Sequence, residues 1–426
     1  MRRGSLPGVR IRILLVMVLS VVAVGCYGGD GYNDYTKGPS APGGATSVAE
    51  YGPGAFSHPA ANLSDLEEAR FRIGDTFFTE PWTSAPGSNP ERDGLGPTYL
   101  ATSCAACHPA DGRSAAPGTP GDDGSPILRF VDSEGVATNQ DAYHFQLQTV
   151  AVDGVEPEAT LDIVWEVIEG QYPDGILYSL RRPVVSVTGE SFGSLSDATA
   201  TGLRVGPPLI GLGLLEAIPE ADIRAGADPE DSDGDGISGR ISTVDSELSG
   251  ADALGRFGLK ANVATVAEQT AIAYLLDLGI TTPLHPEENC PPAQTACAGA
   301  ASGGSPEISE DRFDDVVFYT QTLAVPSRAF AEDESVIEGE ALFDELGCSL
   351  CHVRRWETGD HQIEAVSNQT IYPYTDLLLH DMGPELSDGR ADGVATATEW
   401  KTPALWGLGL TRSVNAAAGF LHDGRA

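Results

Sequence analysis

The chain has 426 residues, of which 41% are hydrophobic and 20% charged, a composition typical of a folded protein with about two to three domains. Its 62 acidic residues outnumber the 25 basic ones, which gives a formal net charge of −37. So acidic a surface repels phosphate backbones and anionic lipid headgroups, and this excludes nucleic acid as a partner. A cationic protein partner or a small neutral substrate is compatible with this charge.

The first 26 residues have the pattern of an export signal. Arginines precede an apolar run at residues 13–24, which is too short to span a bilayer as a mature helix. The run ends in the tetrapeptide AVGC, which is similar to a bacterial lipobox, so lipidation of Cys26 is expected. An ordinary secretory signal is the alternative. We expect a protein of the periplasm, outer membrane or cell surface that meets the membrane only through a lipid anchor.

The first predicted helix begins after Ser64. Ser64 and Glu67 have the spacing of a capping box, in which each side chain bonds to the backbone amide of the other residue. Apolar residues at helical intervals then carry the helix through Phe71 to Phe78. We expect a long loop of about 25 residues between this helix and Cys104.

The pattern Cys-x-x-Cys-His occurs twice, about 240 residues apart. A c-type haem needs two thiols spaced to reach its two vinyl groups, and an imidazole directly after them to bind the iron. We therefore predict two covalently bound c-type haems. The attachment residues are Cys104 and Cys107 for the first haem, with His108 on its iron, and Cys348 and Cys351 for the second, with His352 on its iron.

Two other chemistries use paired cysteines. A zinc site gathers its ligands from two knuckles that usually lie about 15–20 residues apart, much closer than the two motifs of this chain. A dithiol redox motif of the thioredoxin type carries no histidine directly after its second cysteine. Haem attachment therefore explains both motifs better than either alternative.

The segment between the two motifs is predicted to contain strands, helices and a disulfide. β-branched residues and turn signals at residues 150–187 favour a few short strands. Helical periodicity covers residues 263–278 and 309–324. Cys290 and Cys297 are close enough in sequence to close a small loop, and an exported protein meets conditions that permit this disulfide.

A helix is also predicted directly before the second motif, with Ser335 as its cap. The spacing from Gly339 to Cys348 is that of the first helix of cytochrome c, in which the glycine permits a close helix crossing. Residues 207–214 and 403–410 then repeat the pattern P-x-L-x-G-L-G-L, one copy after each motif. Apolar Gly-Leu runs recur easily, but the same order twice favours duplicated haem domains.

The predicted fold is mainly α, with two cytochrome c-like haem domains, long irregular insertions and a few short strands. The abundance of glycine (50) and proline (29) indicates the irregular backbone. The expected division is a lipoprotein-type signal peptide at residues 1–26, a flexible tether at 27–60, a first c-type haem domain with an insertion at 61–250, a helical connector with the Cys290–Cys297 loop at 251–330 and a second c-type haem domain at 331–426.

Several stretches, in a fixed order, resemble one known family. They are Gly94 to Pro97, Leu209 to Glu220, Asp228 to Arg240, Gly255 to Gly258, Tyr374 to Gly383 and Lys401 to Arg425. From about residue 65 to its end, the chain resembles the bacterial di-haem oxidoreductases, which are related to the di-haem cytochrome c peroxidases.

The resemblance implies an enzyme that reduces hydrogen peroxide, or a similar small oxidant, with electrons passed from one haem to the other. Because of the charge of −37, the electron donor is expected to be a cationic protein such as a basic cytochrome c. The alternative is a non-enzymatic electron-transfer cytochrome, in which both irons carry two protein ligands.

Two further residues are candidates for roles at the haems. Glu216 is the only carboxylate in the apolar run of residues 209–218, and burial there would raise its pKa toward that of an acid–base group, unless it serves as a cap or in an ion pair. Met382 is the only methionine left after signal cleavage, so it must supply the sulfur if either iron has a His/Met ligand pair. Relatives take this ligand from a segment beyond Ala426. The sequence is therefore expected to be a C-terminally truncated fragment or to leave that haem open, with Met382 in packing as the alternative.

An acidic run resembles the start of a calcium-binding loop. Asp231, Asp233 and Asp235 alternate in the way such loops require, ahead of a glycine. Position twelve of an EF-hand would be Ser242 instead of a glutamate, which excludes a complete EF-hand. A calcium site of another geometry and a solvated acidic turn are the two alternatives.

Overall fold

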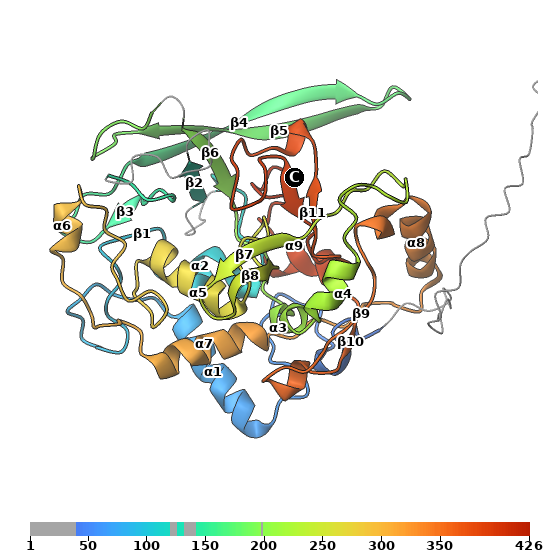
Figure 1. Ribbon diagram of the computed structural model, residues 1–426, viewed down its shortest axis with the longest axis horizontal. Coiled ribbons are helices and arrows are strands. Elements are labelled where there is room, and N and C mark those ends of the chain that lie inside the picture. The colour runs from blue at the N-terminus through green and yellow to red at the C-terminus, as the bar shows by residue number, and fades with distance from the viewer. Residues whose placement is uncertain (1–39, 120–125, 132–141, 197–198) are drawn as a thin grey trace, which may run out of the picture.

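The computed structural model describes residues 40–119, 126–131, 142–196 and 199–426 (Figure 1). Its helices are α1 (Asp65–Thr79), α2 (Cys104–Cys107), α3 (Leu212–Glu216), α4 (Glu220–Ala225), α5 (Val266–Ala273), α6 (Thr295–Ala298), α7 (Glu310–Gln321), α8 (Glu334–Glu345) and α9 (Thr411–Val414). Its strands are β1 (Thr98–Tyr99), β2 (Ile127–Val131), β3 (Val150–Ala151), β4 (Thr160–Gln171), β5 (Leu177–Thr188), β6 (Ala200–Arg204), β7 (Ser242–Ser246), β8 (Gly250–Gly255), β9 (Trp356–Glu357), β10 (Thr370–Ile371), β11 (Leu379–Asp381) and β12 (Glu399–Lys401). Helix accounts for 25% and strand for 20%, and the mainly α class stays a prediction. The predicted signal peptide with Cys26 lies outside the described residues.

Every sheet in the described part of the chain has two strands. The longest pair is the β4–β5 hairpin, which runs across the top of the molecule in Figure 1, in register from Thr160 opposite Thr188 to Gln171 opposite Leu177. Ile163 and Val185, which face each other across this hairpin, pack against a buried cluster around Phe130. The predicted strands between residues 150 and 187 are present, but this hairpin is longer than the short strands expected.

The predicted helices on either side of the first motif are confirmed. The Ser64–Glu67 capping box opens α1, as its spacing predicts. The helix expected at residues 263–278 consists of α5 followed by a π-helical turn, η3 (Tyr274–Leu278). It ends at Gly279, whose φ of 68° is a left-handed conformation that glycine adopts without strain.

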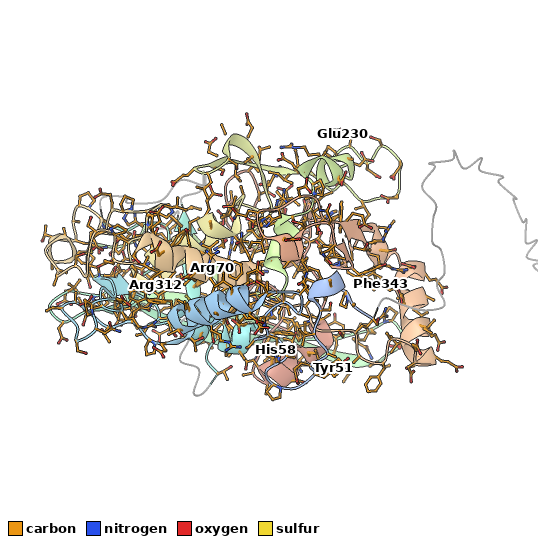
Figure 2. The ribbon with its side chains drawn as sticks, turned by 90° about the horizontal axis from the view of Figure 1, so that it is seen from below. Tyr51, His58, Arg70, Glu230, Arg312 and Phe343 are labelled. Carbon is orange, nitrogen blue, oxygen red and sulfur yellow. A yellow bond between two sulfur atoms is a disulfide. The ribbon has the colours of Figure 1, made fainter. Side chains whose placement is uncertain are left out.

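The closest helix packing joins α1 and α7, which cross at the bottom of the molecule in Figure 1. Figure 2 shows Arg70 of α1 and Arg312 of α7 near each other, and both guanidinium groups reach Asp315, at 3.0 and 3.3 Å. At the crossing, a Cβ atom at Gly74 would lie 2.6 Å from the Cβ of Tyr319 and closer still to the carbonyl oxygen of Asp315. Only a glycine therefore allows this approach.

One large hydrophobic core takes residues from both predicted haem domains. Phe71 and Phe78 of the first domain share it with Ile363, Leu377 and Trp406 of the second. The core therefore packs segments of both predicted haem domains into one body.

The predicted tether is wrong over its described part, residues 40–60. Ala55 and Phe56 are each 1% exposed and belong to the large core. Val48 and Pro59 form β-bridges to Pro326 and Leu323, in the segment after α7. The tether prediction rested on the glycine and proline content, which describes backbone freedom but does not detect the apolar side chains that anchor the segment.

The prediction for α8 needs two corrections. The helix begins two residues earlier than expected, and its cap is Asp333, whose carboxylate accepts a hydrogen bond from the amide of Ser335 at 2.9 Å. Aspartate caps helices as well as serine does, so composition alone did not distinguish them. Gly339 makes no close crossing, because a Cβ atom there would meet nothing within 4 Å.

Cys290 and Cys297 form the predicted disulfide, with their Cα atoms 5.6 Å apart. Among the described residues, no helix combines the length and the apolar character needed to cross a bilayer.

The two glycines make a matched pair for a stability test. Gly74→Ala should lower the free energy of unfolding by about 1–3 kcal/mol, because the added methyl group overpacks the α1–α7 crossing. Gly339→Ala should keep or raise stability, by up to about 1 kcal/mol, because the methyl group enters open space and alanine favours the helix. Denaturant unfolding of both variants measures the difference. Equal changes in the free energy of unfolding of the two variants would contradict a close contact between α1 and α7 at Gly74.

Candidate functional site

The first cysteine motif forms a single helical turn. The cysteines occupy the first and last positions of α2, so their side chains lie on one face of the turn. His108 follows as the C-cap residue, and its amide donates to the carbonyl oxygen of Cys104 at 2.9 Å. The motif thus presents two sulfur atoms and one imidazole to the same side, as attachment of a c-type haem requires.

A hydrogen bond fixes the imidazole of His108. Its Nδ1 lies 2.8 Å from the carbonyl oxygen of Pro207, and because a carbonyl only accepts, Nδ1 carries the proton. The lone pair is then on Nε2, which is the atom that binds a metal. Gly206 makes room for the ring, since a Cβ there would lie 2.8 Å from its Cε1. Burial lowers the pKa of His108, which favours the neutral imidazole that a metal ligand must be.

A cavity of about 430 Å³ opens beside this motif, and Cys104, Cys107 and His108 all line it. Most of its wall is apolar. The apolar lining includes Phe78, Leu209, Leu212, Phe257, Val263 and Val316. A largely apolar cavity with two thiols and a metal-binding imidazole in its wall fits a flat, largely apolar cofactor such as haem. The residues present therefore fit the predicted first haem.

The thiol of Cys104 is unlike that of a dithiol redox catalyst. Burial, with help from the nearby Asp277, raises its pKa to about 12. Redox cysteines have lowered pKa values, because the thiolate is the reactive form. The environment of Cys104 thus argues against the dithiol alternative.

The second motif repeats the same local geometry nearer the surface. The turn η4 (Cys348–Leu350) places the amide of His352 at 3.0 Å from the carbonyl oxygen of Cys348. The Nδ1 atom of His352 donates to the carbonyl oxygen of Tyr374 at 2.8 Å, which again leaves Nε2 for a metal. Phe343, on α8 at the edge of the molecule in Figure 2, packs its ring against both His352 and Tyr374.

Sequence reasoning missed His380, which lies against the second motif. Its Nδ1 is 3.8 Å from Sγ of Cys351, and its Nε2 donates to the carboxylate of Asp376 at 2.7 Å. Burial alone would lower the pKa of His380, but the bond to Asp376 and the contact with Cys351 raise it to about 10. Met382, two residues further on, is 50% exposed. The segment therefore turns its histidine, and not its methionine, toward the motif.

Glu216 is not where the sequence placed it. It is absent from the lining of the cavity and instead accepts hydrogen bonds from the amide of Val266 at 2.8 Å and the side-chain amide of Gln321 at 2.5 Å. His361 adds a third contact, at 3.4 Å. Burial alone would raise the pKa of Glu216, but these partners outweigh burial and lower it. The expected raised pKa is wrong, and the alternative of a capping carboxylate describes its contacts.

The cavity contains another carboxylate, Asp277 of η3. Burial raises its pKa, while Gln146 donates a hydrogen bond to its Oδ1 at 2.7 Å. An isolated carboxylate among leucines at residues 275–278 is the same kind of signal that singled out Glu216. Asp277 could therefore have been singled out from the sequence. The sequence does not say, however, whether Asp277 or Glu216 lines the cavity.

The structure brings the three acidic side chains of the predicted calcium loop together. Carboxylate oxygens of Asp231, Asp233 and Asp235 lie within 4.8 Å of one another. Glu230, next to them, lies on an outer loop of the molecule (Figure 2). Exposed acidic groups often cluster without an ion, so calcium here stays a prediction.

A family model described as "Di-haem oxidoreductase, putative peroxidase" matches residues 35–136 and 155–426. The chain belongs to this family. No curated protein and no solved structure matches the chain significantly. The protein is thus a di-haem oxidoreductase, and its two Cys-x-x-Cys-His motifs are consistent with the two haems that the family implies.

Haem attachment can be tested by removing one pair of thiols. Cys104→Ala combined with Cys107→Ala should halve the haem content per chain of the di-haem oxidoreductase, because the second motif still binds its haem covalently. Pyridine haemochrome spectra and haem staining of denaturing gels measure this content. The control, Cys290→Ala with Cys297→Ala, loses the disulfide and should keep both haems. An unchanged content in the first variant would rule out attachment at Cys104 and Cys107.

The exposure of Met382 gives a second prediction. Met382→Leu should leave the optical and EPR spectra of both haems unchanged, because a half-exposed side chain of similar volume is replaced. Loss of a sulfur-to-iron charge-transfer band on this substitution would instead identify Met382 as an iron ligand.

Proposed function

We propose that this di-haem oxidoreductase reduces hydrogen peroxide at the first motif, with electrons that enter through the second. The observation that carries the proposal is the apolar cavity of about 430 Å³ beside Cys104, Cys107 and His108. Such a largely apolar cavity can admit a small neutral oxidant.

The second motif is better suited to exchange of electrons with another protein. Leu346 is 76% exposed and Leu350 is 47% exposed, on either side of Cys348. An exposed apolar margin around a redox centre lets a partner approach it closely. This contrast between a first motif in the wall of a cavity and a second motif beside exposed leucines supports the proposed direction of electron flow.

A haem held by Cys104, Cys107 and His108 would supply an iron suited to cleavage of an O–O bond. The chain must supply a proton-transfer group, since reduction of peroxide to two molecules of water consumes two protons. We assign this role to Asp277, because it lines the cavity and burial raises its pKa toward the range of an acid–base group. Gln269 and Thr270, on α5, contribute amide and hydroxyl groups to the same wall, where they can orient a small polar molecule.

Asp277→Asn tests this assignment. It should lower the rate of peroxide reduction by about 100-fold, because asparagine cannot transfer the proton although it can still accept the bond from Gln146. Haem content and optical spectra should match those of the parent. In the comparison variant Glu216→Gln, the main change should be in the free energy of unfolding. Its rate of peroxide reduction should change much less than that of Asp277→Asn.

The peroxide proposal itself depends on an open coordination position. EPR of the haem-loaded protein should show a high-spin ferric signal that hydrogen peroxide changes. Two low-spin signals that do not respond to peroxide would contradict peroxide reduction. They would instead support the alternative, a non-enzymatic electron-transfer cytochrome.

Charge predicts how the electron donor binds. With a cationic donor such as a basic cytochrome c, turnover should fall steeply between ~10 and ~300 mM salt, because the Debye length shrinks from about 30 Å to about 6 Å. Turnover with an uncharged small reductant should be independent of salt and serves as the control. A salt-independent rate with the cationic donor would contradict electrostatic docking.

We also propose that the protein is exported and anchored by a lipid on Cys26. The disulfide between Cys290 and Cys297 supports this location, because disulfides persist in oxidising compartments.

A further inference from the structure

One wall of the cavity at the first motif is lined by arginines, in a chain whose net charge is −37. Arg129 stands on β2 and Arg204 on β6, and these strands pair with Ile127 opposite Arg204 and Arg129 opposite Gly202. Alternate residues of a strand lie on one face of a sheet, and directly opposite residues share that face. The register therefore places Arg129 and Arg204 on the same face as Ile127 and Val131, and all four residues line the cavity. The third arginine, Arg390, comes from the segment before β12.

These arginines belong to a buried group of charged side chains, which we call the cation cluster. Its members are Arg129, Arg204, Lys260, Asp388, Arg390 and Asp392. Arg204 bonds to Asp388 at 2.8 Å and to Asp392 at 3.2 Å, and Arg390 bonds to Asp392 at 2.9 Å. Lys260 is fully buried and lies 3.2 Å from Asp388.

The cluster has more positive charge than its own carboxylates neutralise. Four cations face two aspartates, which leaves an excess of two positive charges. Asp277, on the same cavity wall, also acts on Arg129, and among the residues that the structure describes the excess is still positive when its carboxylate is counted. Nearby His422 adds no charge at neutral pH, since burial lowers its pKa to about 4. Buried cations without a counter-charge are costly, so the cavity is built to receive an anion.

Two donor atoms in the cluster are without an acceptor among the described residues. They are the buried Nε atoms of Arg204 and Arg390, whose residues are only 5% and 3% exposed. A buried donor left without an acceptor costs about 1–3 kcal/mol. A carboxylate in the cavity would satisfy such donors, because arginine binds carboxylates through paired N–H groups.

We infer that the cation cluster binds the two propionate carboxylates of the haem attached at the first motif. The same cavity is lined at one place by the two thiols and the imidazole, and at another by Arg129, Arg204 and Arg390. A c-type haem is attached through its vinyl groups and carries its two negative charges on the propionates, so both features suit one molecule. The inference rests on haem attachment at Cys104 and Cys107 but not on peroxide chemistry.

The first haem would then also connect distant segments of the chain. Arg129 and Arg204 precede the second motif by more than a hundred residues, whereas Asp388, Arg390 and Asp392 follow it. Haem propionates held by this cluster would therefore join segments from both predicted haem domains. Loss of the first haem should loosen that junction.

The reduction potential of the first haem provides one test. Arg129→Gln removes one cation, and Asp392 retains Arg204 and Arg390, so the variant should fold. The potential of the first haem should fall, with equilibrium against a fixed redox dye shifting about tenfold toward the ferric form, because the uncompensated propionate charge stabilises ferric iron. Resonance Raman propionate bands should shift as well. The second haem is the internal control, and Arg182→Gln, in an exposed pair with Glu166, is the external one.

The outcome separates this inference from the proposed function. If haem content equals that of the parent while the potential of the first haem and its propionate bands are unchanged in Arg129→Gln, the inference is overturned. If Arg129→Gln shifts the potential and the propionate bands while the EPR signals of the parent do not respond to hydrogen peroxide, the inference stands and the proposed peroxide reduction fails.

A stability cycle provides the second test, which needs no enzyme assay. Arg390→Gln should lower the melting temperature of the protein with both haems more than that of the Cys104→Ala, Cys107→Ala protein, where the excess positive charge has no counter-ion. Equal shifts in the two backgrounds would show that Arg390 serves the ion-pair network only, and would overturn the inference. If Arg390→Gln does not fold, the cycle is measured with Arg129→Gln.

Discussion

The crossing of α1 and α7 at Gly74 supports the first motif and the cavity beside it. Tyr319 of α7 packs against Phe71 and Phe78 of α1, with ring centroids 4.6 and 5.2 Å apart. Its hydroxyl group donates to Asp111 at 2.7 Å, in the turn that directly follows His108. Burial raises the pKa of Asp111 to about 6, and the bond to Tyr319 holds this carboxyl group in place. The helix crossing thereby fixes both the phenylalanine in the cavity wall and the turn that carries the imidazole.

The two motifs show how one local geometry can serve two roles. In both, a helical turn places the thiols together, and a backbone carbonyl holds Nδ1 of the histidine so that Nε2 can bind a metal. Their surroundings differ, since the first motif lines a cavity and the second lies beside exposed leucines. Access to each metal position is therefore set by the packing around the motif and not by the motif itself.

Charge is distributed unevenly over this acidic chain. Most of its carboxylates are on the surface, whereas four of its few basic side chains are gathered in one buried cluster against the cavity. Burial opposes the charge on these groups and lowers the pKa of Lys260 to about 8. Three backbone carbonyl groups accept hydrogen bonds from the Lys260 ammonium group, and the indole of Trp400 lies 4.2 Å from it. Such support for buried cations is understandable if the cavity holds an anionic group.

The sequence alone determined the features whose partners are neighbours along the chain. The Cys-x-x-Cys-His motifs, the Ser64–Glu67 capping box and the Cys290–Cys297 disulfide each join residues separated by fewer than ten positions, so their spacing is their geometry. The tertiary structure decided what depends on distant segments. It assigned Glu216 to a capping network and Asp277 to the cavity, and it brought His380 to the second motif. It also assembled Arg129, Arg204 and Arg390 in one wall. In the sequence, Glu216 and Asp277 look alike, since each is an isolated charge in an apolar run. The residues that determine their pKa values lie fifty or more positions away along the chain and meet them only when the core is packed. The sequence therefore cannot separate their roles.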